Sequence, residues 1–66
     1  MRENFYAEYA GTLNDGSRAW WAKYRFQQSA IIKTVNDRFG IVVFNSEEAA
    51  EAAAVRAHSK SYQEAA

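Results

Sequence analysis

The 66-residue chain has no cysteine and no proline, and it contains a single histidine. Without cysteine, there is no disulfide to compensate for a small core, no thiolate nucleophile and no zinc–thiolate site. A domain of this size buries only about 60% of the surface that its unfolded chain exposes, so its stability is expected to be low. Cohesion must come from the apolar residues, which make up 48% of the sequence, or from a second copy of the chain.

The sequence also lacks net charge and long apolar runs. Lysine and arginine number 8, as do aspartate and glutamate, so there is no general attraction to nucleic acid or to an anionic membrane. No apolar stretch approaches the ~20 residues of a membrane span, and the opening Met-Arg-Glu-Asn lacks the apolar core of a signal peptide. We therefore expect a soluble, cytoplasmic protein that does not bind membranes.

Groups suited to catalysis are few. His58 falls near the C-terminal end of a predicted helix, where a cation is favoured, so we interpret it as structural or solvated. Glu47, Glu48 and Glu51 suit the positive N-terminal end of the same helix, which explains them without a metal. The three glycines are scattered and form no phosphate-binding loop. We expect no enzymatic activity, no metal and no cofactor.

The rest of the chain is organised around residues 4–27, which predict a β-hairpin. Asp15-Gly16 lies between two aromatic-rich runs, and this is a strong hairpin signal because glycine adopts the positive φ that a tight turn needs. We favour a two-residue loop at Asp15-Gly16. The alternative is a three-residue loop over residues 14–16 with Gly16 as a bulge, which shifts the register by one residue.

The two-residue loop predicts a definite register, in which Glu8 faces Lys23 and Tyr6 faces Arg25. It is preferred because it separates an apolar face of the hairpin from a mixed one, and one buried face is what specifies a register. The apolar face would consist of Phe5, Tyr9, Leu13, Trp20, Tyr24 and Phe26.

The middle of the chain predicts two more strands. Residues 30–35 are rich in β-branched side chains, residues 36–38 resemble a turn, and residues 39–44 form an apolar run that implies a central or well-covered strand. The rival interpretation is a helix over residues 29–39, capped by Ser29, which would give the order ββαβα. The β-branched residues favour the strands.

Residues 46–64 are rich in alanine and predict a helix. Asn45 is expected to cap it, with Glu48 completing a capping box. The stripe of small residues at Ala50, Ala53, Ala54 and Ala57 would let the helix lie close to a sheet that carries bulky rings. The sequence therefore predicts one α+β domain over residues 1–66, in which a small antiparallel sheet of three to four strands, N-terminal hairpin first, packs against one C-terminal helix.

Trp20 and Trp21 are adjacent in a predicted strand, so their indoles must point to opposite faces of the sheet. Trp21 is expected on the outer face, and Trp, Tyr and Arg are the residue types that dominate binding hot spots. The predicted partner-binding patch consists of Tyr6, Trp21, Lys23 and Arg25. In the competing interpretation, Trp21 packs on Ala10 or covers a second, minor core.

These features favour a non-catalytic protein-binding module. A short chain with its own initiator methionine and no catalytic set is typical of small regulators or inhibitors, such as phages and other mobile elements encode, that occupy a surface of a larger partner complex. A sheet backed by a helix is also similar to small modules that lay strands in the DNA major groove; Arg18, Lys33 and Arg38 would then contact nucleic acid beside Lys23 and Arg25.

Self-association is the third alternative. An unprotected outer strand over residues 5–9 or 31–35 could pair with its copy across a two-fold axis and merge two sheets into one homo-oligomer.

Overall fold

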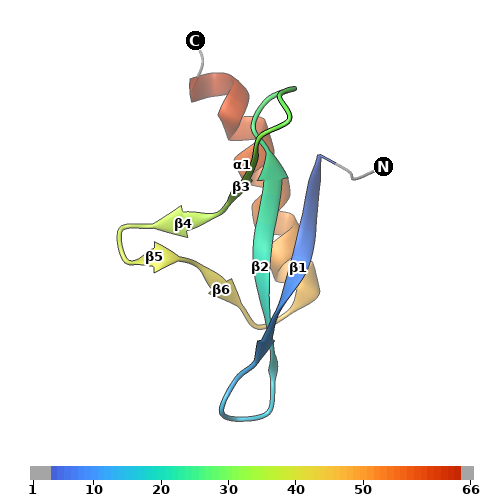
Figure 1. Ribbon diagram of the computed structural model, residues 1–66, viewed down its shortest axis with the longest axis vertical. Coiled ribbons are helices and arrows are strands. Elements are labelled where there is room, and N and C mark those ends of the chain that lie inside the picture. The colour runs from blue at the N-terminus through green and yellow to red at the C-terminus, as the bar shows by residue number, and fades with distance from the viewer. Residues whose placement is uncertain (1–3, 65–66) are drawn as a thin grey trace.

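A hairpin of two long strands, β1 (Phe5–Thr12) and β2 (Arg18–Arg25), forms the middle of the protein (Figure 1). The computed structural model describes residues 4–64. Strand β2 pairs with β1 along one edge, and along the other edge it pairs with both β3 (Ile32–Thr34) and β6 (Val43–Phe44). The result is an antiparallel sheet of 4 strands with β2 at its centre and β1 at its margin.

Between β3 and β6 the chain leaves the sheet as a small hairpin of β4 (Asn36–Asp37) and β5 (Gly40–Ile41). The Val35 N–H donates to the Ala22 carbonyl at 2.9 Å, and the Val42 N–H donates to the Val35 carbonyl at 3.1 Å. These bonds tie the base of the small hairpin to the sheet, and its tip projects sideways (Figure 1). The strand prediction for this region is confirmed, and the helical alternative over residues 29–39 is wrong.

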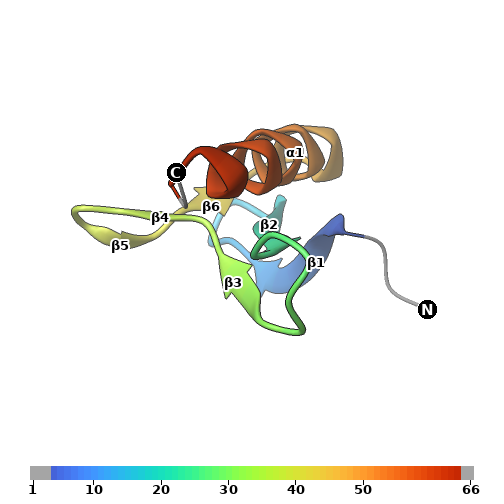
Figure 2. The same ribbon diagram turned by 90° about the horizontal axis from the view of Figure 1, so that it is seen from above.

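Helix α1 (Glu47–Glu64) lies across one face of the sheet (Figure 2). The Ala49 N–H donates to the Ser46 hydroxyl at 3.1 Å, so Ser46 caps the helix and the prediction of Asn45 is wrong. The reason is geometric: a capping side chain bonds the N–H two or three positions further on, and from a helix that begins at Glu47 only Ser46 is in that place.

The core is built from small helix residues against large sheet residues. Ala50 and Ala54 are fully buried, and together with Ala53 and Ala22 they form its centre. The partly buried residues that pack around this centre are Phe5, Ala7, Trp20, Tyr24, Val35 and Phe44. The predicted packing of an alanine stripe against sheet rings is therefore confirmed, as is the α+β fold.

Two residues of the predicted apolar face are exposed. Leu13 is 41% exposed because it belongs to the turn rather than to either strand. Tyr9 is 52% exposed; its ring meets the edge of Trp20 at 5.5 Å, and its hydroxyl lies 2.8 Å from that of Thr12.

The hairpin register differs from the prediction by two residues. The Leu13 N–H donates to the Ser17 carbonyl, which closes the three-residue loop that was the alternative, and Gly16 takes the positive φ of 91°. Further along, pairing passes from Gly11–Ala19 to Tyr9–Trp20, so Ala10 has no partner on β2 and forms a β-bulge.

The loop and the bulge each displace the register by one residue. Beyond the bulge they together displace it by two, which returns the side chains of residues 5–9 to the face that the two-residue loop predicted, because side chains alternate with a period of two. Tyr6 now faces Lys23, and Glu8 faces Trp21. The predicted facing pairs were wrong, although the division into two faces was right along β2.

The C-terminal half of α1 is fixed to the end of β2. Ser61 is buried at 2% exposure; its hydroxyl accepts from the Gln27 N–H at 3.0 Å and donates to the His58 carbonyl at 2.6 Å. The His58 ring contacts the Arg25 carbonyl through Nδ1 at 2.7 Å, and since a carbonyl only accepts, Nδ1 carries the proton. These contacts give His58 a structural role in docking the helix.

Candidate binding surface

The sheet has one face that α1 covers and one that it does not, which we call the helix-free face (Figure 2). Trp20 and Tyr24 pack against the helix, so the alternation of side chains along β2 directs Trp21, Lys23 and Arg25 to the helix-free face. Tyr6 pairs directly with Lys23 and therefore shares that face. The structure thus brings together all four residues of the predicted patch.

The side chains of this patch are held by local contacts. The Lys23 ammonium lies 5.3 Å from the centre of the Trp21 ring system, and it also donates to the Thr34 hydroxyl. The Arg25 guanidinium donates to the Ser29 carbonyl at 2.9 Å. A cation over an indole contributes about 0.5–1 kcal/mol at an exposed site. These contacts restrict the rotamers of half-buried side chains, which lowers the entropy lost when a partner binds.

Two apolar residues that the sequence analysis did not assign extend the patch. Val43 pairs with Trp21, and Ile32 pairs with Arg25, so both lie on the helix-free face. They are 50% and 37% exposed, respectively. The sequence could not place them there because both strands look equally apolar on their two faces.

The projecting hairpin adds more exposed apolar surface. Phe39 at its tip is 89% exposed, and Ile41 is 54% exposed. The Phe39 N–H donates to an Asp37 carboxylate oxygen at 2.8 Å, and the Arg38 guanidinium carbon lies 5.8 Å from the Phe39 ring centre. The prediction of a central, well-covered strand over residues 39–44 is therefore wrong. The predicted turn at residues 36–38 is also displaced, since Asp37 pairs with Gly40 and the turn falls at Arg38-Phe39.

The residues proposed for nucleic-acid contact do not form one patch. Arg18 begins β2 beside the turn, and Arg38 lies at the tip of the projecting hairpin. Lys33 pairs with Tyr24, which places it on the side of the sheet that faces α1, and its ammonium lies 4.1 Å from the Phe26 ring centre. The cations of the helix-free face are Lys23 and Arg25 only, within the part of the chain that the structure describes.

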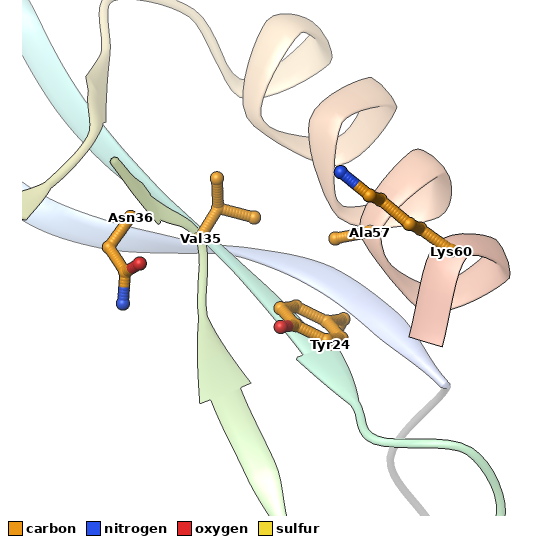
Figure 3. A pocket seen from close by; sticks show the side chains of 5 residues that line it. All are labelled: Tyr24, Val35, Asn36, Ala57 and Lys60. Atoms are coloured by element: carbon orange, nitrogen blue, oxygen red, sulfur yellow. The ribbon is translucent and has the colours of Figure 1, made fainter. Parts of the chain in front are cut away.

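A shallow cavity of about 280 Å³ lies where β3 continues into β4 beside the helix (Figure 3). It is lined by Tyr24, Val35, Asn36, Ala57 and Lys60. Its volume is slightly below the range of typical small-molecule sites. The small side chain of Ala57 and the departure of the chain from the sheet at Val35 create this space, and neither fact is visible in the sequence.

Asp15 lies in the turn of the first hairpin, and its pKa is lowered by hydrogen bonds from Ser17. The Ser17 hydroxyl donates to its carboxylate at 2.6 Å and the Ser17 N–H at 2.9 Å, and these bonds lower the pKa of Asp15. The site is an exposed turn, so the perturbation reflects turn structure rather than chemistry on a substrate.

Over residues 4–64, no group of three or more His, Cys, Asp or Glu side chains is placed to hold a metal ion. In the same range, no helix is long and apolar enough to cross a membrane. Comparisons with protein-family models, with curated proteins and with solved structures found no match. The geometry of the helix-free face is therefore the basis for a functional hypothesis.

Proposed function

We propose that this protein is a non-catalytic protein-binding module that docks on a larger partner through its helix-free face. The observation that carries the proposal is the position of Trp21. Its indole lies on a face that α1 does not cover, with Lys23 over the ring and the half-exposed Val43 across from it. An aromatic anchor surrounded by apolar and cationic side chains is the usual composition of a binding hot spot.

The electrostatics of the face favour a protein over nucleic acid. Glu8 pairs with Trp21, so an acidic residue shares the face on which a base would have to stack, and its charge would repel a phosphate backbone. Lys23 and Arg25 already bond within the protein, and the chain as a whole has no net charge. Nucleic-acid binding depends on contacts between phosphates and cationic side chains that outnumber the acidic ones, and this face does not offer such an excess of positive charge.

The same composition indicates what the partner would present. Trp21 and Val43 would fill an apolar depression, and acidic groups at its rim would complement Lys23 and Arg25. As a non-catalytic module, it would act by occupying the partner's surface. It would act in the cytoplasm as a small regulator or inhibitor of a larger complex, of the type that phages and other mobile elements encode.

The test is affinity capture from an extract of the source cells with the wild type and two variants, Trp21→Ala and Leu13→Ala. Leu13 is also partly exposed but lies in the turn, outside the helix-free face. We expect the wild type and Leu13→Ala to capture the same protein, and Trp21→Ala to lose it by at least about tenfold. The captured protein is then purified and its dissociation constant measured with each variant.

Circular dichroism of Trp21→Ala is the folding control. If that variant unfolds, Lys23→Glu serves as the second probe, because reversing a rim charge should weaken binding without removing packed apolar surface. Equal capture by Trp21→Ala and the wild type would refute the proposal. Binding to nucleic acid at ~50 mM salt that falls steeply by 200 mM would instead support the nucleic-acid alternative.

A further inference from the structure

Strand β1 is an edge strand with few of the usual safeguards. Within residues 4–64 it pairs only with β2. Natural edge strands are commonly protected by proline, by lysine or by bulges, since open backbone groups attract another strand. Residues 5–9 form a regular stretch without proline or lysine, and the bulge at Ala10 begins only beyond it. Glu8 is the single charged residue in the stretch.

The direction of the backbone groups in β1 follows from one hydrogen bond at the end of its ladder with β2. The Arg25 N–H donates to the Asn4 carbonyl at 2.7 Å, so Asn4 and Arg25 form a hydrogen-bonded pair at the end of the ladder. In an antiparallel ladder such pairs alternate with pairs that are not hydrogen-bonded. Phe5, Ala7 and Tyr9 therefore direct their N–H and C=O groups away from β2, toward the open edge.

We propose that two copies of this chain pair antiparallel along β1, about a two-fold axis at Ala7. In this register Phe5 of one copy faces Tyr9 of the other, and Ala7 faces Ala7. All the outward backbone groups of the regular stretch then meet, and the residues of each facing pair exchange two hydrogen bonds. The two sheets become one continuous sheet with an isologous interface.

The position of Glu8 favours this register over the one with the axis at Glu8. With the axis at Ala7, Glu8 of one copy lies opposite Tyr6 of the other. Moving the axis to Glu8 would set two carboxylates directly opposite each other, which is destabilising in a sheet. It would also bring the Ala10 bulge toward the pairing stretch, where the ladder is disrupted.

Half-exposed apolar side chains border the same edge on the helix side. The His58 ring lies 6.1 Å from the Phe5 ring and 5.3 Å from the Tyr62 ring, which places this side of α1 above β1. Val55 is three residues before His58 on the helix, so it follows the same stripe. Tyr9, Tyr62 and Val55 are 52%, 45% and 37% exposed. Pairing about Ala7 sets Tyr9 of one copy beside Phe5 of the other and covers this apolar surface.

Both helix-free faces stay open in such a dimer, because the sheets join edge to edge. Of the four residues of the proposed patch, only Tyr6 lies on β1 itself, and Trp21 lies on β2. Trp21→Ala should therefore leave the self-association unchanged. The proposal predicts that the mass measured by sedimentation equilibrium rises from one chain to two chains as concentration increases.

Ala7→Pro is the main variant. The Ala7 N–H points to the open edge, so proline there removes no bond to β2 but removes both N–H donors at the axis, and proline is tolerated at strand edges. We expect the dissociation constant of the dimer to rise at least about tenfold, because two hydrogen bonds between the copies are lost. Ala7→Ser keeps the N–H and is the matched control, with circular dichroism to check that both variants fold.

A cross-linking experiment tests the register even if Ala7→Pro does not fold. The chain has no cysteine, so Tyr6→Cys and Glu8→Cys each carry one thiol. In the proposed register these positions face each other in a pair that is not hydrogen-bonded, where the Cβ atoms are close. A mixture of the two variants should form a disulfide dimer several-fold faster than either alone. The proposal would be refuted if sedimentation equilibrium gave the mass of a single chain at protein concentrations up to about 1 mM. It would also be refuted if the mixture of the two cysteine variants cross-linked no faster than either variant alone.

Discussion

The same strands present two different faces, one covered by α1 and one left open. The face toward α1 is closed by alanines, and its rings fill the space that these small side chains leave. The helix-free face carries two rings and two cations, and no element within residues 4–64 lies across it. The contrast is sharpest at Trp20 and Trp21, which are adjacent in sequence and identical in chemistry, so differences between them isolate the effect of the face.

The largest expected effect separates these two tryptophans. Trp20→Ala removes a ring that packs on the buried alanines, so we expect the free energy of unfolding to fall by about 3 kcal/mol, at the lower end for a core aromatic. Trp21→Ala should lower it by less than about 1 kcal/mol, as is usual for a surface position. Urea denaturation followed by circular dichroism measures both.

Because a domain this small has little stability to lose, Trp20→Ala should be largely unfolded without denaturant near physiological temperature. If the free energy of unfolding falls by a similar amount in the two variants, the two faces do not differ in their contribution to stability, and Trp21 is part of a second core.

An intermediate effect is expected on the helix. Ala54 is fully buried against the sheet, whereas Ala52 is exposed. Ala54→Leu would force the helix away from the rings of β2, and we expect it to lower the free energy of unfolding by about 2 kcal/mol. Ala52→Leu introduces the same side chain on the other side of α1 and should change it by less than about 0.5 kcal/mol. Thermal denaturation of the pair measures the difference, and equal midpoints would show that the contact between α1 and the sheet tolerates added volume.

The smallest effect lies in the turn, outside both faces. Hydrogen bonds from Ser17 lower the pKa of Asp15 in the folded protein. The stability that they contribute is therefore present above the unfolded pKa of about 3.9 and is lost as pH falls through the lower folded value. Ser17→Ala should raise the pKa of Asp15 toward its usual value, as measured by NMR titration of the carboxyl carbon.

Ser17→Thr keeps the hydroxyl and should keep the lowered pKa. Neither change should alter the packing of Trp20 or the exposure of Trp21, since the turn lies beyond both. An unchanged titration of Asp15 in Ser17→Ala would show that the hydroxyl is not the main cause of the shift.

Local signals in the sequence were sufficient for the overall fold. The turn residues, the β-branched run and the alanine-rich segment each predicted the right element, because each reflects a backbone preference of nearby residues. The division of β2 into two faces followed from alternation alone, and with it the grouping of Trp21, Lys23 and Arg25. Tyr6 of β1 shares their face because the offsets of the loop and the bulge cancel. Whether these residues bind a partner stays a prediction.

The details that failed depend on contacts between distant segments. The continuous apolar run over residues 39–44 looked like a buried strand, yet the chain leaves the sheet at Val35 and exposes Phe39. Nothing local distinguishes these cases, since burial depends on what else reaches the strand. Likewise, Asn45 and Ser46 are both good caps, and the choice between them is made by where packing against the sheet starts the helix.

The bulge gives the first hairpin one position at which its length can change. Ala10 has no partner on β2, whereas Tyr9 pairs with Trp20 and Gly11 pairs with the adjacent Ala19. Deleting Ala10 would therefore leave a regular ladder with the same pairs, and Phe5 and Ala7 would stay on the face toward α1. Deleting a residue within the stretch 5–9 would instead turn the residues before it to the opposite face of the sheet. A shortened relative of this hairpin should therefore have lost its residue at the bulge.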